Sequence, residues 1–213
     1  RLGAQYNFFW RIQQGILFND VCEKDELLSM KWVMKPSKRS IIKKGMLEEP
    51  RILIDFESIQ ALCGKIINYK NIVDEIGSDK IEFKDCDILT NKLRPYLGYT
   101  ILNEPEKNMI GSTEFVSFDI NKQIAYPEYI RYIMLTAEYL NYSKVLMSGN
   151  EHPRIGLSDI LNLRIPVPKL KKQELIIDTI RQKEEKNNAI IDDIFSLRSK
   201  IDECITMTLK CSS

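Results

Sequence analysis

The sequence has few cysteines and a single histidine, and both shortages limit the kinds of protein it can be. The five cysteines are scattered over 213 residues and none forms a C-x-x-C pair, which argues against a disulfide scaffold and a zinc or redox site. No apolar run approaches the roughly 20 residues that span a bilayer, and the N-terminus lacks a secretory pattern. We therefore expect a soluble, reduced, cytoplasmic chain with no membrane partner and no metal.

Two catalytic motifs are also absent. A methyltransferase that acts on adenine needs a (D/N)-P-P-(Y/F) loop to hold the amino group, and the sequence contains no Pro-Pro dipeptide. It also contains no G-x-x-x-x-G-K-[ST] loop for the phosphates of ATP. We expect that this chain needs no cofactor and is not itself an enzyme, so that any associated catalysis lies elsewhere.

The chain has no excess of charge of either sign. Lys and Arg number 31 and Asp and Glu number 30, which gives a formal net charge of +1. With 29% charged and 44% hydrophobic residues, the composition excludes a disordered chain, but it lacks the basic excess usual in nucleic-acid-binding domains. The charges are nevertheless grouped, with six basic residues and no acidic one between Leu27 and Leu47, and six acidic residues between Asp74 and Asp87. This grouping predicts separate basic and acidic patches within a net charge near zero.

Patterning through the middle of the chain indicates a mixed α+β domain with a twisted β-sheet and flanking helices. Residues 51–56, 81–84 and 114–118 show the alternation of strands, and 87–98 is expected to be an extended run that ends where Pro95 removes a ladder donor. Pro127 suits the first turn of a helix of about four turns, because apolar residues recur at helical spacing as far as Leu140. A short helix is expected from Ser158 by N-cap preference, followed by an extended segment at 164–168.

The pattern changes at the C-terminal end, where 171–210 contain neither Gly nor Pro. Apolar residues there recur at alternating spacings of four and three, which predicts a long coiled-coil-type helix with an apolar seam. The predicted interface residues of this seam are Ile176, Ile180, Asn187, Ile190, Ile194, Leu197 and Ile201. We therefore divide the chain into a globular domain at 1–168 and a helix at 169–213 that packs on its own domain, a second copy of the chain or another protein. Because the first residue is Arg1 rather than Met, we expect a piece of a longer polypeptide.

Several linked motifs, in order, resemble the specificity subunits of type I restriction-modification systems. They are Gly64-Lys-Ile-Ile, Cys86-Asp-Ile-Leu-Thr-Asn-Lys-Leu-Arg-Pro-Tyr-Leu-Gly, Gly111-Ser-Thr-Glu-Phe, Pro127-Glu-Tyr-Ile, His152-Pro-Arg-Ile-Gly-Leu-Ser-Asp-Ile-Leu-Asn-Leu-Arg-Ile-Pro-Val-Pro and Gln173-Glu. The resemblance covers roughly residues 50 to 210, departs at Cys86 where the family usually has Gly, and leaves 1–49 unassigned. It implies a non-catalytic target recognition domain that directs an adenine methyltransferase, and in complete systems a nuclease, to double-stranded DNA. A single domain with one helix implies either a half-subunit that forms a homodimer through the helix or the C-terminal part of a fused enzyme.

Candidate DNA contacts come from three regions of the sequence and from Lys65 in the Gly64-Lys-Ile-Ile motif. The basic run is expected to follow phosphates as an arm or loop, although a solvated surface loop is an equal alternative. Side chains at 92, 94 and 96 alternate along the expected extended run, and Asn and Arg in the turn-rich loop 149–154 have the chemistry to contact adenine and guanine edges. The candidates are Lys35, Lys38, Arg39, Lys43, Lys44, Lys65, Lys92, Arg94, Tyr96, Asn150 and Arg154. The residues Ser112, Thr113 and Glu114 are expected to turn the chain or cap a backbone group.

Two other functions remain open. Asp55 followed by Glu82-Phe-Lys84 satisfies the loose D…E-x-K spacing of metal-dependent nucleases, in which two carboxylates hold Mg²⁺ and the lysine stabilises developing charge. That spacing arises easily by chance in a chain that is 29% charged. The other alternative is a protein-interaction module whose helix binds a partner and whose domain has no affinity for DNA.

Overall fold

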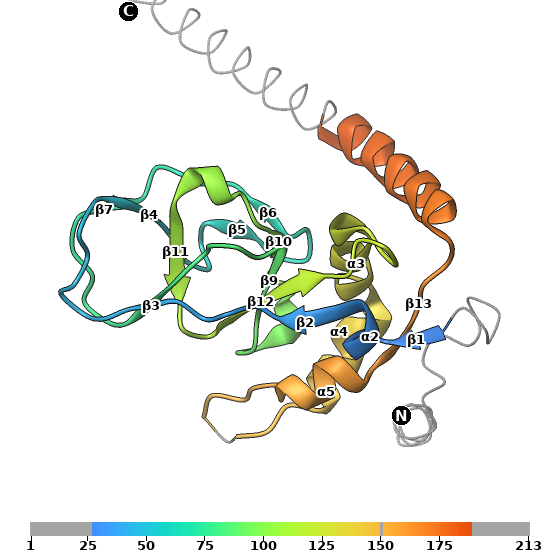
Figure 1. Ribbon diagram of the computed structural model, residues 1–213, viewed down its shortest axis with the longest axis horizontal. Helices are drawn as coiled ribbons and strands as arrows, with labels where there is room; N and C mark the ends of the chain where they lie inside the picture. The colour runs from blue at the N-terminus through green and yellow to red at the C-terminus, as the bar shows by residue number, and fades with distance from the viewer. Residues whose placement is uncertain (1–26, 150, 189–213) are drawn as a thin grey trace, which may run out of the picture. The chain divides into compact units, whose positions relative to one another are not determined.

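A computed structural model describes residues 27–149 and 151–188. The chain divides into two compact units, 1–173 and 174–213, and each is considered by itself. Strands and helices both occur in the first unit, so the predicted α+β class is confirmed (Figure 1). In the described part of the chain, no helix is long and apolar enough to cross a membrane.

Four sheets form in the described residues. The order of the four-stranded antiparallel sheet is β10-β9-β12-β2, and that of the five-stranded sheet is β3-β8-β11-β4-β7, in which β11 and β4 run parallel. The first sheet comprises β2 (Met34–Pro36), β9 (Ile88–Asn91), β10 (Thr100–Leu102) and β12 (Phe115–Ile120). The second comprises β3 (Ile41–Ile42), β4 (Arg51–Ile54), β7 (Ile72–Val73), β8 (Lys80–Glu82) and β11 (Met109–Ser112). The two-stranded sheets pair β1 (Leu27–Ser29) with β13 (Arg164–Pro166) and β5 (Ile59–Gln60) with β6 (Lys65–Ile66).

Apolar side chains from the two large sheets meet in one core. This cluster includes Ile54 and Met109 from the five-stranded sheet and Leu89, Ile101 and Phe115 from the four-stranded sheet, all nearly inaccessible to solvent. Burial of this apolar area is the main force that holds the sheets together. In Figure 1 the five-stranded sheet lies at one end of this unit and the helices gather at the other.

The helices are short. They are α2 (Met30–Val33), α3 (Pro127–Met134), α4 (Ala137–Val145) and α5 (Leu157–Asn162), with 3₁₀ turns η2 (Pro95–Leu97) and η3 (Pro105–Lys107). Helix α3 contacts β10, α4 contacts η2, and α2 contacts α5. A further helix covers 170–188 in the described residues. The predicted strands at 51–56, 81–84 and 114–118 and the extended segment at 164–168 correspond to β4, β8, β12 and β13, which confirms those assignments.

The single helix predicted after Pro127 is wrong. The chain leaves the helical conformation at Thr136, whose backbone is extended at φ −67° and ψ 151°, and two helices result. The Thr136 hydroxyl accepts a hydrogen bond from the Tyr139 amide and so caps α4. The short helix predicted from Ser158 does form, but its N-cap is Gly156.

The extended run predicted for 87–98 is also wrong beyond Asn91, where β9 ends. The Asn91 side chain accepts a hydrogen bond from the Leu93 amide at 3.0 Å, which turns the chain. Arg94 then adopts a left-handed conformation at φ 49°, and Pro95 begins η2. Lys92, Arg94 and Tyr96 therefore do not share one face of a strand.

Candidate functional site

The basic run 31–44 is built into both large sheets. The run begins in α2, continues into β2, the edge strand beside β12, and later forms β3, the edge strand beside β8. Backbone and side-chain contacts hold the residues between them, because the Ser37 amide donates to Ser117 at 3.0 Å and the Ser40 hydroxyl donates to Glu82 at 2.9 Å. The run is therefore part of the fold, and the expectation of an arm or loop is wrong for its paired strands.

The acidic and basic runs are not separate patches throughout, which corrects the prediction from the charge pattern. Because β3 pairs with β8, Lys43 reaches Asp79 at 2.8 Å, and the Lys44 amide donates to the same carboxylate at 3.0 Å. The contact with Lys43 holds the pKa of the Asp79 carboxyl below its ordinary value. Asp79 thus offsets the charge of Lys43, and it holds the backbone of Lys44.

Basic side chains from distant parts of the sequence meet where the chain passes from one large sheet to the other. The segment between β2 and β3 crosses at Arg39, whose guanidinium donates to the Thr113 carbonyl at 2.6 Å. The turn between β11 and β12 crosses at the same place, and the Lys92 amide donates to the Glu114 carbonyl at 3.0 Å. Arg154 completes the group by an ion pair with Glu114 at 2.6 Å.

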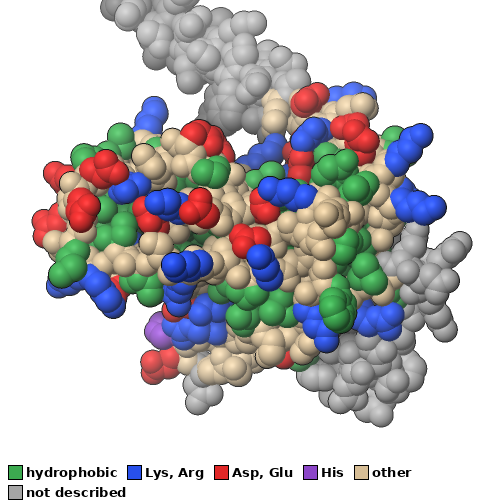
Figure 2. All heavy atoms as spheres, in the orientation of Figure 1, with side chains coloured by type: hydrophobic (Ala, Val, Ile, Leu, Met, Phe, Trp, Pro, Cys, Tyr) green, Lys and Arg blue, Asp and Glu red, His purple; other side chains and the backbone are tan. Residues whose placement is uncertain are grey.

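We call this group, with Arg94, the Glu114 cluster: Arg39, Lys92, Arg94, Glu114 and Arg154. Arg94 joins it through its amide, which donates to the Pro153 carbonyl at 3.2 Å. Arg39 and Arg94 are exposed, whereas Lys92, Glu114 and Arg154 are half-buried. Figure 2 shows Lys and Arg side chains gathered beside the chain's only histidine, His152 in the adjoining loop. The cluster contains four cationic groups and one carboxylate, a local excess that suits a phosphate-bearing ligand.

Glu114 is the member whose importance the motifs did not reveal. Sequence reasoning assigned Ser112, Thr113 and Glu114 to a turn, and the Ser112 hydroxyl does accept a hydrogen bond from the Glu114 amide at 3.2 Å, which confirms that role. The carboxylate, however, also receives two hydrogen bonds from Arg154. Arg154 lowers the pKa of the Glu114 carboxyl, so the group is an anion at neutral pH. Its place in the Gly111-Ser-Thr-Glu-Phe motif was the one available signal.

The other DNA candidates lie elsewhere. Lys35 is 3.9 Å from Asp119, Lys38 is exposed between β2 and β3, and Lys65 lies in β6. Tyr96 lies in η2, where the Lys144 ammonium is 5.6 Å from its ring centre. Asn150 lies outside the described residues. Of the predicted helix interface, Ile176 and Ile180 are half-buried and Asn187 is exposed, while Ile190, Ile194, Leu197 and Ile201 lie outside the described residues.

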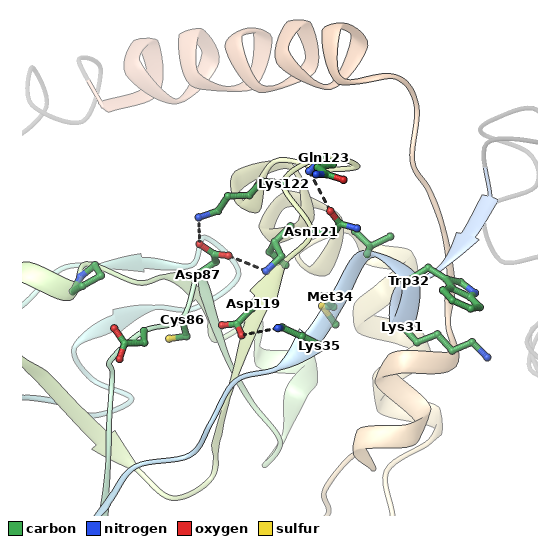
Figure 3. A pocket seen from close by; sticks show the side chains of 14 residues that line it. Lys31, Trp32, Met34, Lys35, Cys86, Asp87, Asp119, Asn121, Lys122 and Gln123 are labelled. Carbon is green, nitrogen blue, oxygen red and sulfur yellow. Dashed lines mark hydrogen bonds and ion pairs between the residues drawn. The ribbon is translucent and has the colours of Figure 1, made fainter.

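A hollow of about 970 Å³ lies between α2, β2 and the end of β12 (Figure 3). Two of its three carboxylates have cationic partners, with Asp87 2.8 Å from Lys122 and Asp119 3.9 Å from Lys35. Cys86, at its wall, is a core residue, and burial raises the pKa of its thiol to about 12. The thiol therefore stays protonated and unreactive at neutral pH.

The nuclease spacing does not produce a metal site. Asp55 directly follows β4 and Glu82 ends β8, and β11 lies between these strands, so the backbones that carry the two carboxylates are separated by roughly 10 Å across the sheet at about 4.8 Å per strand. Ligands of one Mg²⁺ lie at about 2.1 Å from the ion. Glu82 instead lies 3.4 Å from Arg51, and Asp55 accepts hydrogen bonds from Ser58. Among the described residues, no group of three or more His, Cys, Asp or Glu side chains is arranged to hold a metal.

Comparison with known proteins supports the resemblance seen in the motifs. The chain is 26% identical over 152 residues to the type I restriction enzyme HindI specificity subunit of Haemophilus influenzae, an alignment that covers 67% of this chain and 31% of that protein. In fold it resembles the HsdS subunit from Thermoanaerobacter tengcongensis, with a TM-score of 0.63 and 22% identity over 77% of this chain and 43% of that one.

A second solved structure, which describes complex assembly and conformational transition of the type I R-M system, matches with a TM-score of 0.61 and 21% identity, again over 77% of this chain and 43% of that one. The chain thus spans less than half the length of these relatives. The family model for the type I restriction modification DNA specificity domain matches residues 36–194, which includes 36–49 that the motifs had left unassigned. The chain therefore belongs to the type I restriction modification DNA specificity domain family, as its linked motifs predicted.

Proposed function

We propose that this chain is a sequence-specific DNA recognition module of a restriction-modification system. It recognises one part of a longer target site, and catalysis belongs to an associated adenine methyltransferase and nuclease. The observation that carries the proposal is the Glu114 cluster. The fold brings the segments that carry Arg39, Lys92 and Arg94 together beside the ion pair of Arg154 with Glu114, in a chain of the DNA specificity domain family. Cations fixed at one place by the fold are preorganised for phosphate, so little entropy is lost when they bind.

Near-neutral overall charge shapes this proposal. With a net charge of +1 and several lysines next to carboxylates, the chain alone offers few cations for phosphate. We therefore infer weak binding by the isolated chain and a methyltransferase partner that supplies most phosphate contacts. Lys35, Lys38, Lys43, Lys44, Lys65 and Tyr96 remain secondary candidates, because they lie outside the cluster.

The C-terminal helix is proposed to dock the methyltransferase or a second recognition unit, the latter forming a homodimer. The helix at 170–188 continues the heptad spacing of the sequence through Ile176 and Ile180. An amphipathic helix without a partner is marginal in water, so an apolar stripe of this length calls for another surface.

The test is binding of the chain, with and without its methyltransferase, to duplexes selected by the wild type from a random library. Arg94→Ala should weaken binding to all duplexes and lower the slope of log affinity against log salt by about 1. Lys122→Ala is the matched control, because Lys122 is an exposed cation outside the cluster that is already paired with Asp87. If the two variants changed the affinity and the salt slope equally, this would contradict a DNA-binding role of the Glu114 cluster.

The other outcomes of this test identify the alternatives. A wild type that binds duplexes with no sequence preference in the presence of its methyltransferase would contradict sequence-specific recognition. Binding of a protein partner with no DNA affinity would favour the interaction module. Mg²⁺-dependent cutting by the wild type that is lost in Asp55→Asn and Glu82→Gln would restore the nuclease hypothesis. The distance between the strands that carry these two residues argues against it.

A further inference from the structure

The loop at 148–154, which adjoins the Glu114 cluster, is closed at its base. Ser148 and Arg154 form an antiparallel bridge in which each amide donates to the other residue's carbonyl, at 3.0 and 2.9 Å. Gly149, at φ 106°, adopts a conformation that side-chain-bearing residues rarely take. Beyond it, Glu151 and His152 are exposed. The loop therefore presents polar side chains from a fixed base.

One flank of the loop is attached by backbone hydrogen bonds to the segment after β9. The Arg94 amide donates to the Pro153 carbonyl at 3.2 Å, and the Ile155 amide donates to the Lys92 carbonyl at 3.1 Å. Leu93 and Arg154 form an isolated bridge between these two contacts. The loop thus lies directly against the segment that carries two of the cluster's cations.

The other attachment is the side chain of Arg154, which uses all three of its nitrogen atoms. Nε donates to Glu114 Oε2 at 2.8 Å, Nη2 donates to Glu114 Oε1 at 2.6 Å, and Nη1 donates to the His152 carbonyl at 2.9 Å. The first two bonds form a bidentate pair, the arrangement in which the planar guanidinium gives the best-defined geometry. Arg154 therefore makes one hydrogen bond within the loop, to His152, and two to Glu114 in the turn between β11 and β12.

The same geometry limits what Arg154 offers to DNA. A guanidinium that recognises guanine presents two parallel N–H groups to N7 and O6; in Arg154 the pair on Nε and Nη2 is directed at Glu114, and Nη1 donates to the His152 carbonyl. A carboxylate beside a phosphate-binding surface repels phosphate and so weakens binding. Glu114 is explained by a structural role, which is to pair with Arg154.

We propose that Arg154 is a positioning residue, whose ion pair with Glu114 holds residues 151–154 of this loop in the conformation that recognises DNA bases, and that base contacts from these residues come from the exposed side chains of Glu151 and His152. This inference rests on the proposed function. It replaces direct guanine recognition by Arg154 with an indirect role that depends equally on Glu114.

The test compares Glu114→Gln, Arg154→Gln and the double variant in the full chain with its methyltransferase. The measured quantity is the affinity ratio between a duplex selected by the wild type from a random library and a scrambled duplex of the same composition. Each single variant should lower this ratio by about tenfold, and the double variant should be no worse, because both substitutions break one shared network. Arg154→Lys, which keeps the charge but has one donor nitrogen in place of three, should be intermediate.

Binding to the scrambled duplex provides the discriminating measurement. Positioning by Arg154 leaves the salt slope for that duplex unchanged in Arg154→Gln, whereas Arg39→Gln, which removes an exposed cation of the cluster, should lower it by about 1. A lower salt slope in Arg154→Gln, together with tighter binding by Glu114→Gln, would show a phosphate contact and overturn the inference.

A direct base contact has a different signature. Relaxed preference at a single base pair in Arg154→Gln, with no effect of Glu114→Gln, would also overturn the inference while leaving the proposed function intact. A wild type that selects no sequence would overturn the proposed function, and this inference with it. The urea unfolding midpoint of each variant shows whether a loss of binding is caused by unfolding. If Arg154→Gln is unfolded, the affinity ratio of Arg154→Lys is compared with that of the wild type instead.

Discussion

Substitution of Gly64 by Ala tests the packing between the β5–β6 hairpin and the four-stranded sheet. Gly64 has φ 58°, and a Cβ atom there would lie 2.0 Å from the carbonyl oxygen of Thr100 in β10. Arg131 in α3 holds the same turn by donating to the Cys63 and Gly64 carbonyls at 2.9 and 3.3 Å. The added atom therefore has backbone on one side and a turn held by a buried arginine on the other.

Two costs add in Gly64→Ala. The left-handed backbone costs an L-residue about 1–2 kcal/mol, and an extra carbon forced into a packed site costs about 1–3 kcal/mol. The free energy of unfolding should fall by roughly 2–5 kcal/mol, which for a unit of this size lowers the melting temperature by about 4–20 °C. Because domains are stable by about 5–15 kcal/mol, the variant should still fold at low temperature.

Two other glycines separate these costs. Gly45 has φ 72° with no atom within 4 Å of an added Cβ, so Gly45→Ala should show the backbone cost alone, about 1–2 kcal/mol. Gly77 is equally open and lacks a positive φ, so Gly77→Ala should be neutral or slightly stabilising. Urea unfolding followed by far-UV circular dichroism measures all three. Equal midpoints for Gly64→Ala and Gly45→Ala would refute the close approach to Thr100.

Three further predictions concern the cap, the ion pair and the C-terminal helix. Thr136→Ala should lower the free energy of unfolding by about 1 kcal/mol, because it removes the hydroxyl that caps α4; an unchanged urea midpoint would contradict this role. Because Arg154 lowers the pKa of Glu114 in the folded state, the pair should add stability above the ordinary Glu pKa of 4.5 and lose it as pH falls through the lowered value. The stability difference between wild type and Glu114→Gln should therefore shrink on acidification, and a difference that grows below pH 4.5 would be inconsistent with it. Replacing Ile190, Ile194 and Ile201 with Ser should convert a helix-mediated dimer into a monomer by light scattering, and an unchanged mass would exclude that dimer.

Local patterns predicted five of the thirteen strands in the described residues, namely β4, β8, β9, β12 and β13. Alternating apolar residues identified β4 and β12, and the proline at 127 marked the start of α3. The same patterns failed where one side chain diverts the backbone, as at Asn91, which turns the chain, and at Thr136, which caps a second helix. Apolar periodicity continues across such a residue, so it does not show the break.

The sequence by itself determined the α+β class and, through several linked motifs in order, the family. Only the tertiary structure decided which charges meet. Arg39 and Thr113 are 74 residues apart and Arg154 and Glu114 are 40 apart, and they come together because β2 pairs with β12, β3 with β8, and loop 148–154 with the segment after β9. Alternation shows which face of a strand is apolar but not which strand lies beside it, because pairing depends on burial summed over the whole domain. That pairing places Lys43 against Asp79 and brings Arg39, Lys92 and Arg154 to the turn at Glu114, so a chain with a net charge of +1 has a local basic site.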